Sequence, residues 1–470
     1  MKPRLLIDLK PALDGYAGIP QETRLLFNAL NQLPDIEADG LIQHGGKQLR
    51  PNKRPNSPDN AFRDAKTVIS FKSDTRSHLI TAKMALGLSM SPIPFNTTHY
   101  KDFIWSSLFS KSLSSKDRQR VTNARYYIVE HSKNDAYKTG IYSHKYGLGR
   151  RFPNLNTNPW NLFIAQTPYP AKLPKTTKLI IRYHDAVPLL MPDTIKDRWF
   201  HLSSHYQAVK SNIERGAWFS CVSEASRQDL IRFFPETTDR STVIYNMISD
   251  AYYEEASNSV HVNEIVRTRL AHSIKKLVLD ENEAPKYLLM VSTIEPRKNH
   301  QLLIDAWEQL RIMGHSNLKL IIVGNTGWEQ EDLLKSIHKQ QQSGNILHLE
   351  NIPAHELRIL YRHSAATICP SLMEGFDYSG IEAMKSGGYV AASDISVHRE
   401  VYENAALYFD PYSAESAAQA IDQLLNSTAS KIKEQLKNAK EQLLPRYETK
   451  KLINEWSQFI QKILNSSRTS

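Results

Sequence analysis

The chain of 470 residues has few of the features that mark a secreted, fibrous or membrane-spanning protein. Its only two cysteines, Cys221 and Cys369, lie far apart in apolar runs, so we expect a reducing compartment and no disulfide framework. No stretch approaches the roughly 18 consecutive apolar residues of a membrane-spanning helix. The opening MKPRLLIDLK also lacks the long apolar core of a signal peptide. These absences favour a cytoplasmic globular protein whose membrane association, if any, is peripheral.

The composition predicts a large core and two halves of unequal charge. Hydrophobic residues make up 41% of the chain and charged residues 23%, with a formal net charge of +10. Residues 1–280 hold 39 Lys and Arg against 26 Asp and Glu, whereas residues 281–470 hold 20 against 23. A basic half is typical of proteins that meet nucleic acid, an anionic membrane or a phosphorylated substrate.

The densest basic stretch is interleaved with polar residues and contains Lys111, Lys116, Arg118, Arg120 and Arg125. The pattern favours a solvated helix face, with a surface for anionic lipid head groups as the alternative. Since no aromatic residue interrupts residues 111–125, we do not expect a nucleic-acid partner.

The second half of the chain alternates apolar runs with amphipathic segments of helical length. Residues 287–293 and 318–324 read as buried strands, and residues 299–310 and 331–340 read as helices. Because this alternation continues beyond residue 390, it predicts a parallel sheet covered on both faces, which is a doubly wound α/β domain at 284–445.

The first half shows the same alternation less clearly. Strand-like runs at 4–9, 178–185 and 218–225 place a second doubly wound domain at 1–270, and the long polar segment at about 44–160 reads as an elaboration or lid on it. The helix predicted within 446–470 should cross back to this domain. Two such domains are expected to face each other across a cleft, where the carboxyl ends of their strands bind ligands.

The most informative stretch is CPSLMEGFDYSGIEAMKSGG, residues 369–388. A strand, a turn at Glu374 and Gly375, and a helix that begins near residues 378–380 would point the main-chain N–H groups of residues 376–380 into the cleft. A helix N-terminus with free donors attracts phosphate, so we expect a diphosphate cradle. Glu374 and Glu382 flank it, one suited to sugar hydroxyls and the other to a ribose.

This stretch, with SDISVHREV (393–401) and FDPYS (409–413), resembles the donor-binding signature of retaining glycosyltransferases of family 4, which have the GT-B fold. Residues 183–230, 292–307 and 321–329 extend the resemblance. It implies a metal-independent hexosyltransferase in which Glu374 contacts the transferred sugar and Glu382 binds the nucleotide ribose. The donor-binding set would also contain the cradle residues Gly375, Phe376, Asp377, Tyr378, Ser379 and Gly380.

Cations and a histidine complete the expected catalytic set. Arg297 and Lys298 follow a predicted strand and would stabilise the charge of a leaving nucleoside diphosphate. Thr293 stands where many relatives have a further Arg. His184 ends a strand beside Asp185, and the resemblance places it near the reacting carbon; its titration near neutral pH would make activity pH-sensitive. A packing role for His184 is the alternative.

Other positions carry weaker signals. Gly15 and Gly18 precede a helix and look like the family loop that closes over donor and acceptor, although such a pair of glycines is often only a turn. Ile352 aligns with the segment whose main chain reads the nucleobase. Asp377 would repel a diphosphate unless it caps the helix or faces sugar hydroxyls, and Ser379 suits either a cap or a phosphate donor.

The resemblance implies front-face attack, in which the departing diphosphate takes the proton of the acceptor. We expect a nucleotide-sugar donor, GDP-mannose before a UDP-sugar, with no cofactor and no metal. The acceptor would be a saccharide or lipid-linked saccharide of surface polysaccharide or lipopolysaccharide synthesis. The alternative is an inactive GT-B scaffold that binds partners in a polysaccharide assembly complex.

Overall fold

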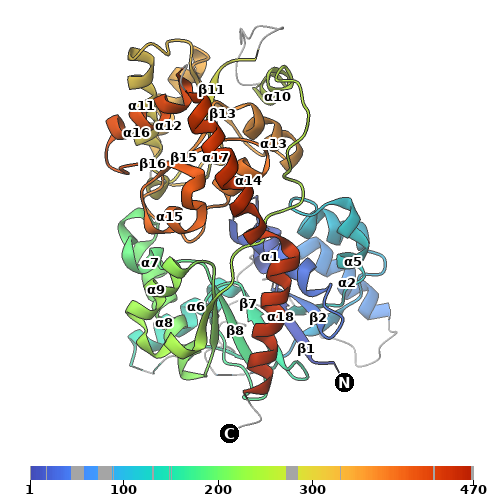
Figure 1. The fold of residues 1–470 in the computed structure, drawn as a ribbon. Coiled ribbons are helices and arrows are strands. Elements are labelled where there is room, and N and C mark those ends of the chain that lie inside the picture. The colour runs from blue at the N-terminus through green and yellow to red at the C-terminus, as the bar shows by residue number, and fades with distance from the viewer. Residues whose placement is uncertain are drawn as a thin grey trace.

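The structure is a computed structural model that describes residues 2–16, 18–43, 58–71, 87, 89–129, 132–147, 149, 151–270, 284–328, 330–426 and 429–466. Two α/β domains lie one above the other, and the last helix runs down from the upper domain along the lower one (Figure 1). The fold therefore has the two doubly wound domains predicted from the sequence.

The first domain is built on an eight-stranded sheet in the order β10-β9-β8-β7-β1-β2-β5-β4. Its strands are β1 (Arg4–Asp8), β2 (Glu37–Gln43), β4 (Ile93–Phe95), β5 (Tyr126–Val129), β7 (Leu162–Ala165), β8 (Lys178–Tyr183), β9 (Trp218–Cys221) and β10 (Ser241–Val243). All neighbours pair parallel except β4, which runs antiparallel to β5. The central strands are buried along nearly their whole length, as expected of a sheet covered on both faces.

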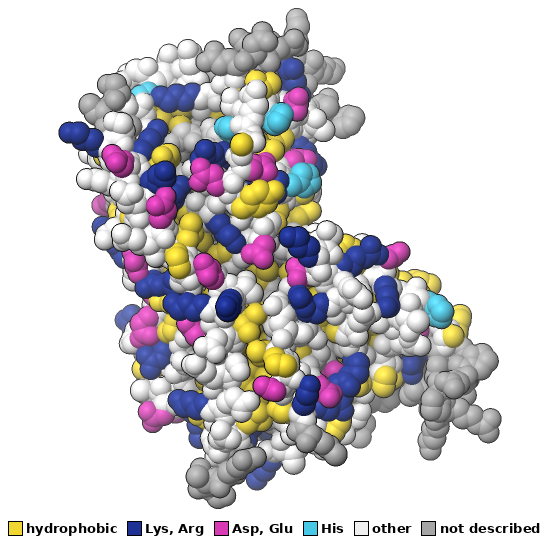
Figure 2. Space-filling model, turned by 45° about the vertical axis from the view of Figure 1, so that its right-hand side comes forward, with side chains coloured by type: hydrophobic (Ala, Val, Ile, Leu, Met, Phe, Trp, Pro, Cys, Tyr) yellow, Lys and Arg dark blue, Asp and Glu magenta, His cyan; other side chains and the backbone are white. Residues whose placement is uncertain are grey.

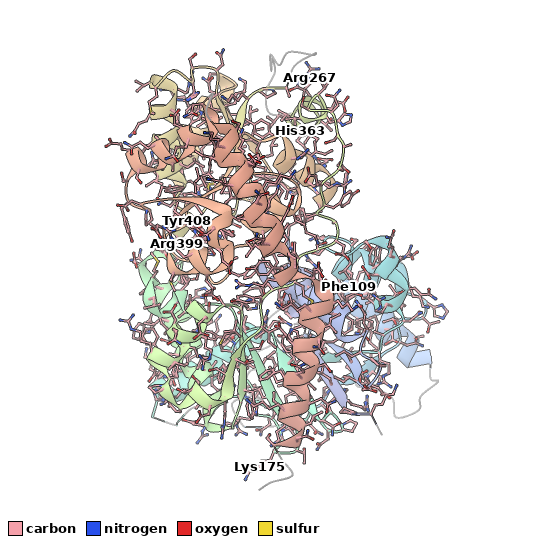
Figure 3. The ribbon with its side chains drawn as sticks, in the orientation of Figure 1. Phe109, Lys175, Arg267, His363, Arg399 and Tyr408 are labelled. Atoms are coloured by element: carbon pink, nitrogen blue, oxygen red, sulfur yellow. The ribbon has the colours of Figure 1, made fainter. Side chains whose placement is uncertain are left out.

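Helices of the first domain are α1 (Gly18–Leu30), α2 (Pro58–Ser70), α4 (Lys101–Ile104), α5 (Arg118–Thr122), α6 (Lys133–Lys145), α7 (Val187–Leu190), α8 (Arg198–Glu214) and α9 (Glu224–Phe233). A separate pair of short strands joins β3 (Ser89–Met90) to β6 (Asn154–Leu155). Helix α1 packs its apolar side on the sheet, where Phe27 stacks on Phe109 with ring centroids 5.6 Å apart. Figure 3 labels Phe109 at this contact.

The second domain has a six-stranded sheet in the order β13-β12-β11-β14-β15-β16, and each pair is parallel. Its strands are β11 (Tyr287–Val291), β12 (Lys319–Val323), β13 (Ile346–Leu349), β14 (Ala366–Cys369), β15 (Val390–Ser393) and β16 (Ala406–Phe409). Its helices are α11 (His300–Ile312), α12 (Glu331–Gln342), α13 (Ala354–His363), α14 (Tyr378–Lys385), α15 (Ser396–Tyr402), α16 (Ala414–Leu425) and α17 (Ala429–Leu443). This strand order, 3-2-1-4-5-6, is that of dinucleotide-binding sheets and confirms the predicted alternation.

The domain boundary predicted at residue 270 lies too far along the chain. Helix α10 (His261–Leu270) packs on α13 and β13, and Val262 and Val266 are buried in the core of the second domain. The polar sequence around this helix hid its buried apolar face. The crossing between the domains therefore precedes α10, after β10.

The last helix, α18 (Thr449–Asn465), packs along the first domain. Leu452, Trp456, Ile460 and Ile463 are buried in a core that also contains Leu5 of β1. The chain thus passes between the domains twice, once after β10 and once between α17 and α18 (Figure 1). No helix in the described part of the chain is long and apolar enough to cross a membrane.

The segment at about 44–160 is more than an elaboration or lid, because its strands β5 and β4 extend the first sheet beyond β2. Their apolar runs are only three or four residues long, too short to stand out in the sequence. Residues 44–57 and 72–86 of this segment lie outside the described residues.

Three arginines of the basic stretch form ion pairs with acidic residues. Arg118 contacts Asp102, Arg120 lies 2.7 Å from Asp117, and Arg125 bonds to Glu37 and Asp39. Figure 2 shows Lys and Arg interspersed with Asp and Glu over the face in view. These pairs favour the solvated face over a lipid-binding surface.

Candidate active site

The topology of the second sheet brings the loops after β11 and β14 together. The chain moves from β11 outward to β12 on one side, and β14 lies on the other side of β11. Ligands bind at such a switch point, beyond the carboxyl ends of the strands. The loop after β11 carries Arg297 and Lys298, and the loop after β14 carries Glu374, so residues far apart in the sequence converge here.

Glu374 is held by both cations. Arg297 donates from Nη1 to Glu374 Oε2 at 2.8 Å and to the carbonyl of Met373 at 3.0 Å, and Lys298 Nζ contacts Glu374 Oε1. Arg297 Nε also lies 2.9 Å from Glu295 Oε1. Burial alone would raise the pKa of Glu374, but the charges of Arg297 and Lys298 outweigh it and lower that pKa below its ordinary value of 4.5. Glu374 is therefore a fixed anion between two cations.

Asp377 caps helix α14, which settles the question that the sequence left open. It adopts the left-handed region with φ of 59°, and its Oδ1 accepts from Ser379 N–H at 3.2 Å and from Ser379 Oγ at 2.6 Å. The prediction of free main-chain donors throughout residues 376–380 is therefore wrong for Ser379, whose N–H and hydroxyl both serve Asp377.

A histidine that the sequence analysis did not single out fixes the other oxygen of Asp377. His398 Nε2 lies 3.1 Å from Asp377 Oδ2, and its Nδ1 lies 2.9 Å from the carbonyl oxygen of Ser393. Both ring nitrogens of His398 therefore face an oxygen that can accept a hydrogen bond. Burial alone would raise the pKa of Asp377, but the hydrogen bond from His398 and the charges of Lys298 and His398 hold it far below its usual value.

Aromatic side chains fix the shape of the cradle. Tyr402 stacks on His398 with ring centroids 5.1 Å apart and donates to the carbonyl of Asp377 at 3.0 Å. A Cβ on Gly380 would lie 2.4 Å from the Tyr402 ring, so only glycine fits there. Phe376 is buried and packs edge-on against the ring of Tyr378, with centroids 5.3 Å apart.

Glu382 meets neutral donors instead of cations. Gln21 Nε2 from α1 donates to Glu382 Oε1 at 2.7 Å, and Tyr361 donates to Oε2 at 3.3 Å. Burial raises the pKa of Glu382 to about 7, although the hydrogen bonds from Gln21, Tyr361 and Tyr252 act in the opposite direction.

On the first-domain side, His184 and Asp185 follow β8 and face the loop that holds Glu374. A Cβ on Gly375 would lie 1.9 Å from the carbonyl oxygen of His184, so the two domains touch here without space for a side chain. Ser223 donates to the Gly375 carbonyl at 2.7 Å. Burial also raises the pKa of Asp185, while the charge of Arg297 acts to lower it.

The expectation that His184 titrates near neutral pH is wrong. Burial lowers the pKa of His184 to about 3, and the charge of Arg182 adds to this effect. The ring bonds to the main chain of Gln166, while its Nε2 is buried and has no partner among the described residues. A neutral imidazole with an unpaired nitrogen at the domain interface suits contact with a substrate hydroxyl.

The residues with weaker sequence signals lie in different parts of the structure. Gly15 and Gly18 lie at the interface, where a Cβ would come within 4.0 Å of Asn325 and 3.5 Å of Tyr378 respectively. Thr293 packs on the loop after β12, against Gly327, at the same edge as the cations. Ile352 follows β13 with its side chain buried in the hydrophobic core, which leaves only its main chain for a ligand.

Sequence reasoning missed Gln21, Glu22, Arg182 and His398. One signal was available, because Arg182 interrupts the buried strand KLIIRY and a charge inside such a strand needs a partner. Glu22 likewise lies on a buried part of α1. Which residues pair with them depends on the packing of two domains, and no local pattern reveals that.

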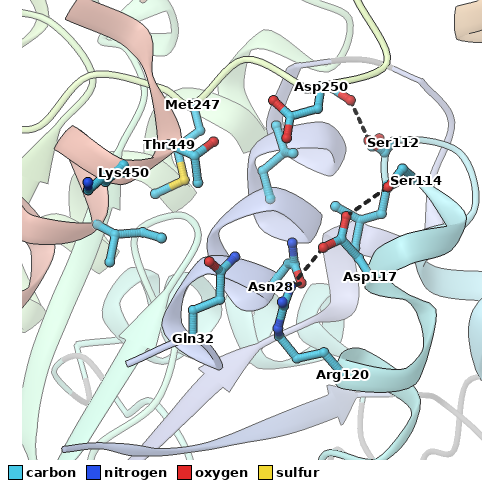
Figure 4. Close-up of a pocket in the computed structure, with 14 residues that line it drawn as sticks. Asn28, Gln32, Ser112, Ser114, Asp117, Arg120, Met247, Asp250, Thr449 and Lys450 are labelled. Carbon is cyan, nitrogen blue, oxygen red and sulfur yellow. Dashed lines mark hydrogen bonds and ion pairs between the residues drawn. The ribbon is translucent and has the colours of Figure 1, made fainter. Parts of the chain in front are cut away.

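A cavity of about 450 Å³ lies away from these residues, between α1, α18 and the connector after β10 (Figure 4). Its lining includes Asn28, Gln32, Met247, Asp250 and Thr449. At the predicted site, by contrast, side chains of the two domains bond to one another. Within the described ranges no three His, Cys, Asp or Glu side chains are grouped to hold a metal ion.

Comparison with known proteins supports the family resemblance and the fold. Residues 273–442 match the family model for glycosyl transferases group 1. The O-antigen chain mannosyltransferase B of Escherichia coli is 26% identical over 249 residues, which are 53% of this chain and 61% of that protein. RfbU, an O-antigen chain mannosyltransferase of Salmonella typhimurium, is 26% identical over 260 residues, 53% of this chain and 65% of that protein. The chain thus spans less than two thirds of these relatives.

Among solved structures, the sucrose-phosphate synthase of Thermosynechococcus elongatus superposes with a TM-score of 0.63 at 14% identity, covering 99% of this chain and 100% of that one. HepE of Anabaena in complex with UDP gives a TM-score of 0.57 at 14% identity, covering 98% and 100%. These likenesses confirm the GT-B fold. The match to the glycosyl transferases group 1 model covers residues 273–442 and agrees with the resemblance.

Proposed function

We propose that this chain, a GT-B protein with a group 1 glycosyltransferase domain, transfers mannose from GDP-mannose to a saccharide or lipid-linked saccharide acceptor. The observation that carries the proposal is the convergence of Arg297 and Lys298 on Glu374, beside the capped N-terminus of α14. The sugar is proposed because several similar proteins are named mannosyltransferases. The same names suggest O-antigen or another surface polysaccharide as the product.

The chemistry follows from where charge develops. As the bond between sugar and diphosphate breaks, negative charge grows on the leaving phosphate, and fixed cations in a partly buried site stabilise it. Arg297 and Lys298 are already oriented by Glu374 and Glu295, so little reorganisation is needed. The main-chain N–H groups at the start of α14 add a positive helix end.

Retention of configuration and independence from metal are part of the proposal. The leaving diphosphate would take the proton of the acceptor, so the protein mainly positions the reactants. Glu374 would hold the sugar hydroxyls, Glu382 the ribose, and neutral His184 would accept or donate a hydrogen bond at a hydroxyl near the reacting carbon. The nucleobase would meet the main chain at Ile352.

Purified protein incubated with GDP-mannose, UDP-glucose, UDP-N-acetylglucosamine and ADP-glucose, with a saccharide acceptor, tests the proposal. We expect release of GDP from GDP-mannose and a mannosylated product with the α-anomeric configuration of the donor by NMR. Release from none of the donors with any acceptor would favour the inactive scaffold, and release of UDP alone would overturn the choice of donor. Metal chelation should leave the rate unchanged.

A lipid-linked acceptor would bring the protein to an anionic membrane. Ion pairs occupy the arginines of the basic stretch, so the proposal of that contact rests on the net positive charge of residues 1–280 as a whole. Co-sedimentation with vesicles of phosphatidylglycerol tests it. We expect binding at low salt that is lost at high salt, and no binding to vesicles of neutral phosphatidylcholine.

A further inference from the structure

Helices α1 and α14 come from different domains, and side chains at their N-terminal ends bond directly. The Tyr378 hydroxyl of α14 donates to Glu22 Oε2 of α1 at 3.0 Å. One residue earlier, Gln21 bonds to Glu382 at 2.7 Å. A Cβ on Gly18, the first residue of α1, would lie 3.5 Å from the Tyr378 ring. The consecutive residues Gln21 and Glu22 of the first domain thus bond to two residues of α14, Glu382 and Tyr378 respectively.

Glu22 is also bound to the first domain through a buried ion pair. Its Oε1 lies 3.0 Å from Arg182 Nη2, and neither side chain has any solvent exposure. The carboxylate accepts a further hydrogen bond from the main chain of Met247. Glu22 Oε1 has no hydrogen-bond partner among the described residues and is balanced only by the charge of Arg182, so loss of the Tyr378 hydroxyl would leave the buried carboxylate with still fewer partners. Glu22 is therefore sensitive to whether Tyr378 is in place.

Arg182 extends this network to the segments that join the domains. Its guanidinium donates to the carbonyl of Ile244 at 2.6 Å and to Asn246 Oδ1 at 2.7 Å, both just after β10. It also lies over the ring of Trp456 in α18, 5.4 Å from the centroid. The connector after β10 is one of the two places where the chain passes between domains, and α18 follows the other, so Arg182 contacts one crossing directly and the middle of the helix that follows the second.

Tyr378 belongs to the proposed diphosphate cradle. It directly follows Asp377, and its ring packs on Phe376 at 5.3 Å. A movement of the domains apart would take the Tyr378 hydroxyl away from Glu22, while Glu22 would stay with Arg182 on the first domain. The hydroxyl contact is therefore made only when the domains are apposed as in this structure.

We propose that Glu22 is a positioning residue that couples domain apposition to the cradle, by accepting the Tyr378 hydroxyl while Arg182 links Glu22 to the connector after β10 and to α18. The effect on sugar transfer rests on the proposed function, whereas the effect on domain arrangement does not. Neither residue needs to touch the reacting atoms for this role.

The test compares Tyr378→Phe with Tyr287→Phe. Each removes one buried hydroxyl, but that of Tyr287 donates to the carbonyl of Leu360 at 2.7 Å within the second domain. Small-angle scattering gives the radius of gyration without ligand and with GDP, and steady-state kinetics give kcat and KM. We expect Tyr378→Phe to increase the ligand-free radius of gyration and to lower kcat about tenfold, with KM for the donor changed less than twofold. Tyr287→Phe should change none of these quantities.

Glu22→Leu removes the acceptor of the Tyr378 hydroxyl and should have the same effects on the radius of gyration and kcat as Tyr378→Phe. The double variant should be no worse than Glu22→Leu alone, because both substitutions remove the same contact. Should Glu22→Leu fail to fold with Arg182 unpaired, Tyr378→Phe alone decides. A Tyr378→Phe protein with the radius of gyration and kcat of the wild type would overturn the proposal, as would equal changes in Tyr287→Phe. If no variant or wild type transfers sugar but the radius increases, the coupling stands and the proposed function fails.

Discussion

Glu374 and Glu382 lie eight residues apart and flank the same cradle, yet their surroundings are opposite. Glu374 is bound by Arg297 and Lys298, and its pKa is lowered. Glu382 is bound by the neutral donors Gln21 and Tyr361, and its pKa is raised to about 7. Burial acts to raise the pKa of both carboxyls, so the difference between their pKa shifts comes from their hydrogen-bond and ion-pair partners.

The difference in partners indicates different functional roles for Glu374 and Glu382. An anion fixed between cations keeps those cations in place and stays charged at neutral pH. A carboxyl near its pKa at neutral pH changes partners at low cost, which suits a group that exchanges Gln21 for a ribose hydroxyl. The four predictions below test this contrast between charged and neutral partners.

The largest expected effect is at the cations. Lys298→Ala removes one of the two charges around Glu374 and one of the charges that would stabilise the leaving diphosphate. We expect kcat to fall about 100-fold or more while the far-ultraviolet circular dichroism stays unchanged. The matched control is Lys335→Ala, at a lysine whose side chain is 75% exposed. Full activity of Lys298→Ala would show that Lys298 has no catalytic role.

Next is the contact of Asp377 with His398, in which both side chains are buried. Asp377→Asn keeps a side chain that can cap α14 but removes the carboxylate charge that faces the ring of His398. We expect the free energy of unfolding in urea to fall by about 3 kcal/mol. A loss below about 1 kcal/mol would show that the charge of Asp377 contributes little to the stability of this contact.

A smaller effect is expected from the pH dependence of stability. The folded chain binds the Glu382 proton more tightly than the unfolded chain does, so stability from this carboxyl is present below pH 4.5 and is lost as pH rises to about 7. Glu382→Gln should reduce the decline in stability between pH 5 and 7 by on the order of 2 kcal/mol. Glu374 has the opposite sign, because its stabilisation is present above pH 4.5 and is lost on acidification.

Thermal unfolding of wild type and Glu382→Gln from pH 4 to 8 measures this difference. Parallel curves for the two proteins would show that Glu382 ionises as an ordinary carboxyl. Gln21→Leu provides the matched change in the partner, because it removes a neutral donor and should raise the pKa of Glu382 further.

The smallest effect is predicted for a charged pair without burial. Asp394 and Arg399 bond at 2.6 Å, but their side chains are 45% and 52% exposed. Arg399 also lies over the ring of Tyr408, and Figure 3 labels both residues. Asp394→Asn should lower the free energy of unfolding by less than about 1 kcal/mol. A loss equal to that of Asp377→Asn would show that burial is not what separates the two pairs.

The sequence predicted the fold well where apolar runs are continuous. Strands such as β11 and β12, with the helices between them, follow from alternation alone, and the order of loops then brings Arg297, Lys298 and Glu374 to one edge. It failed where runs are short, as in β4 and β5, and where a polar surrounding hid an apolar face, as in α10.

Side-chain partners could not be predicted, because they depend on how two domains pack. Gln21 and Glu382 are 361 residues apart, and no local pattern links them. The neutrality of His184 likewise comes from burial by the other domain and from Arg182, whereas the sequence shows only a histidine at the end of a strand.

A crystal structure of the protein with GDP tests the account most directly. We expect the diphosphate against the main chain of residues 375–380, with Arg297 and Lys298 in contact with its oxygens and Glu382 bonded to the ribose in place of Gln21. GDP bound elsewhere, or no GDP at saturating concentration, would contradict the assignment of this interface as the donor site.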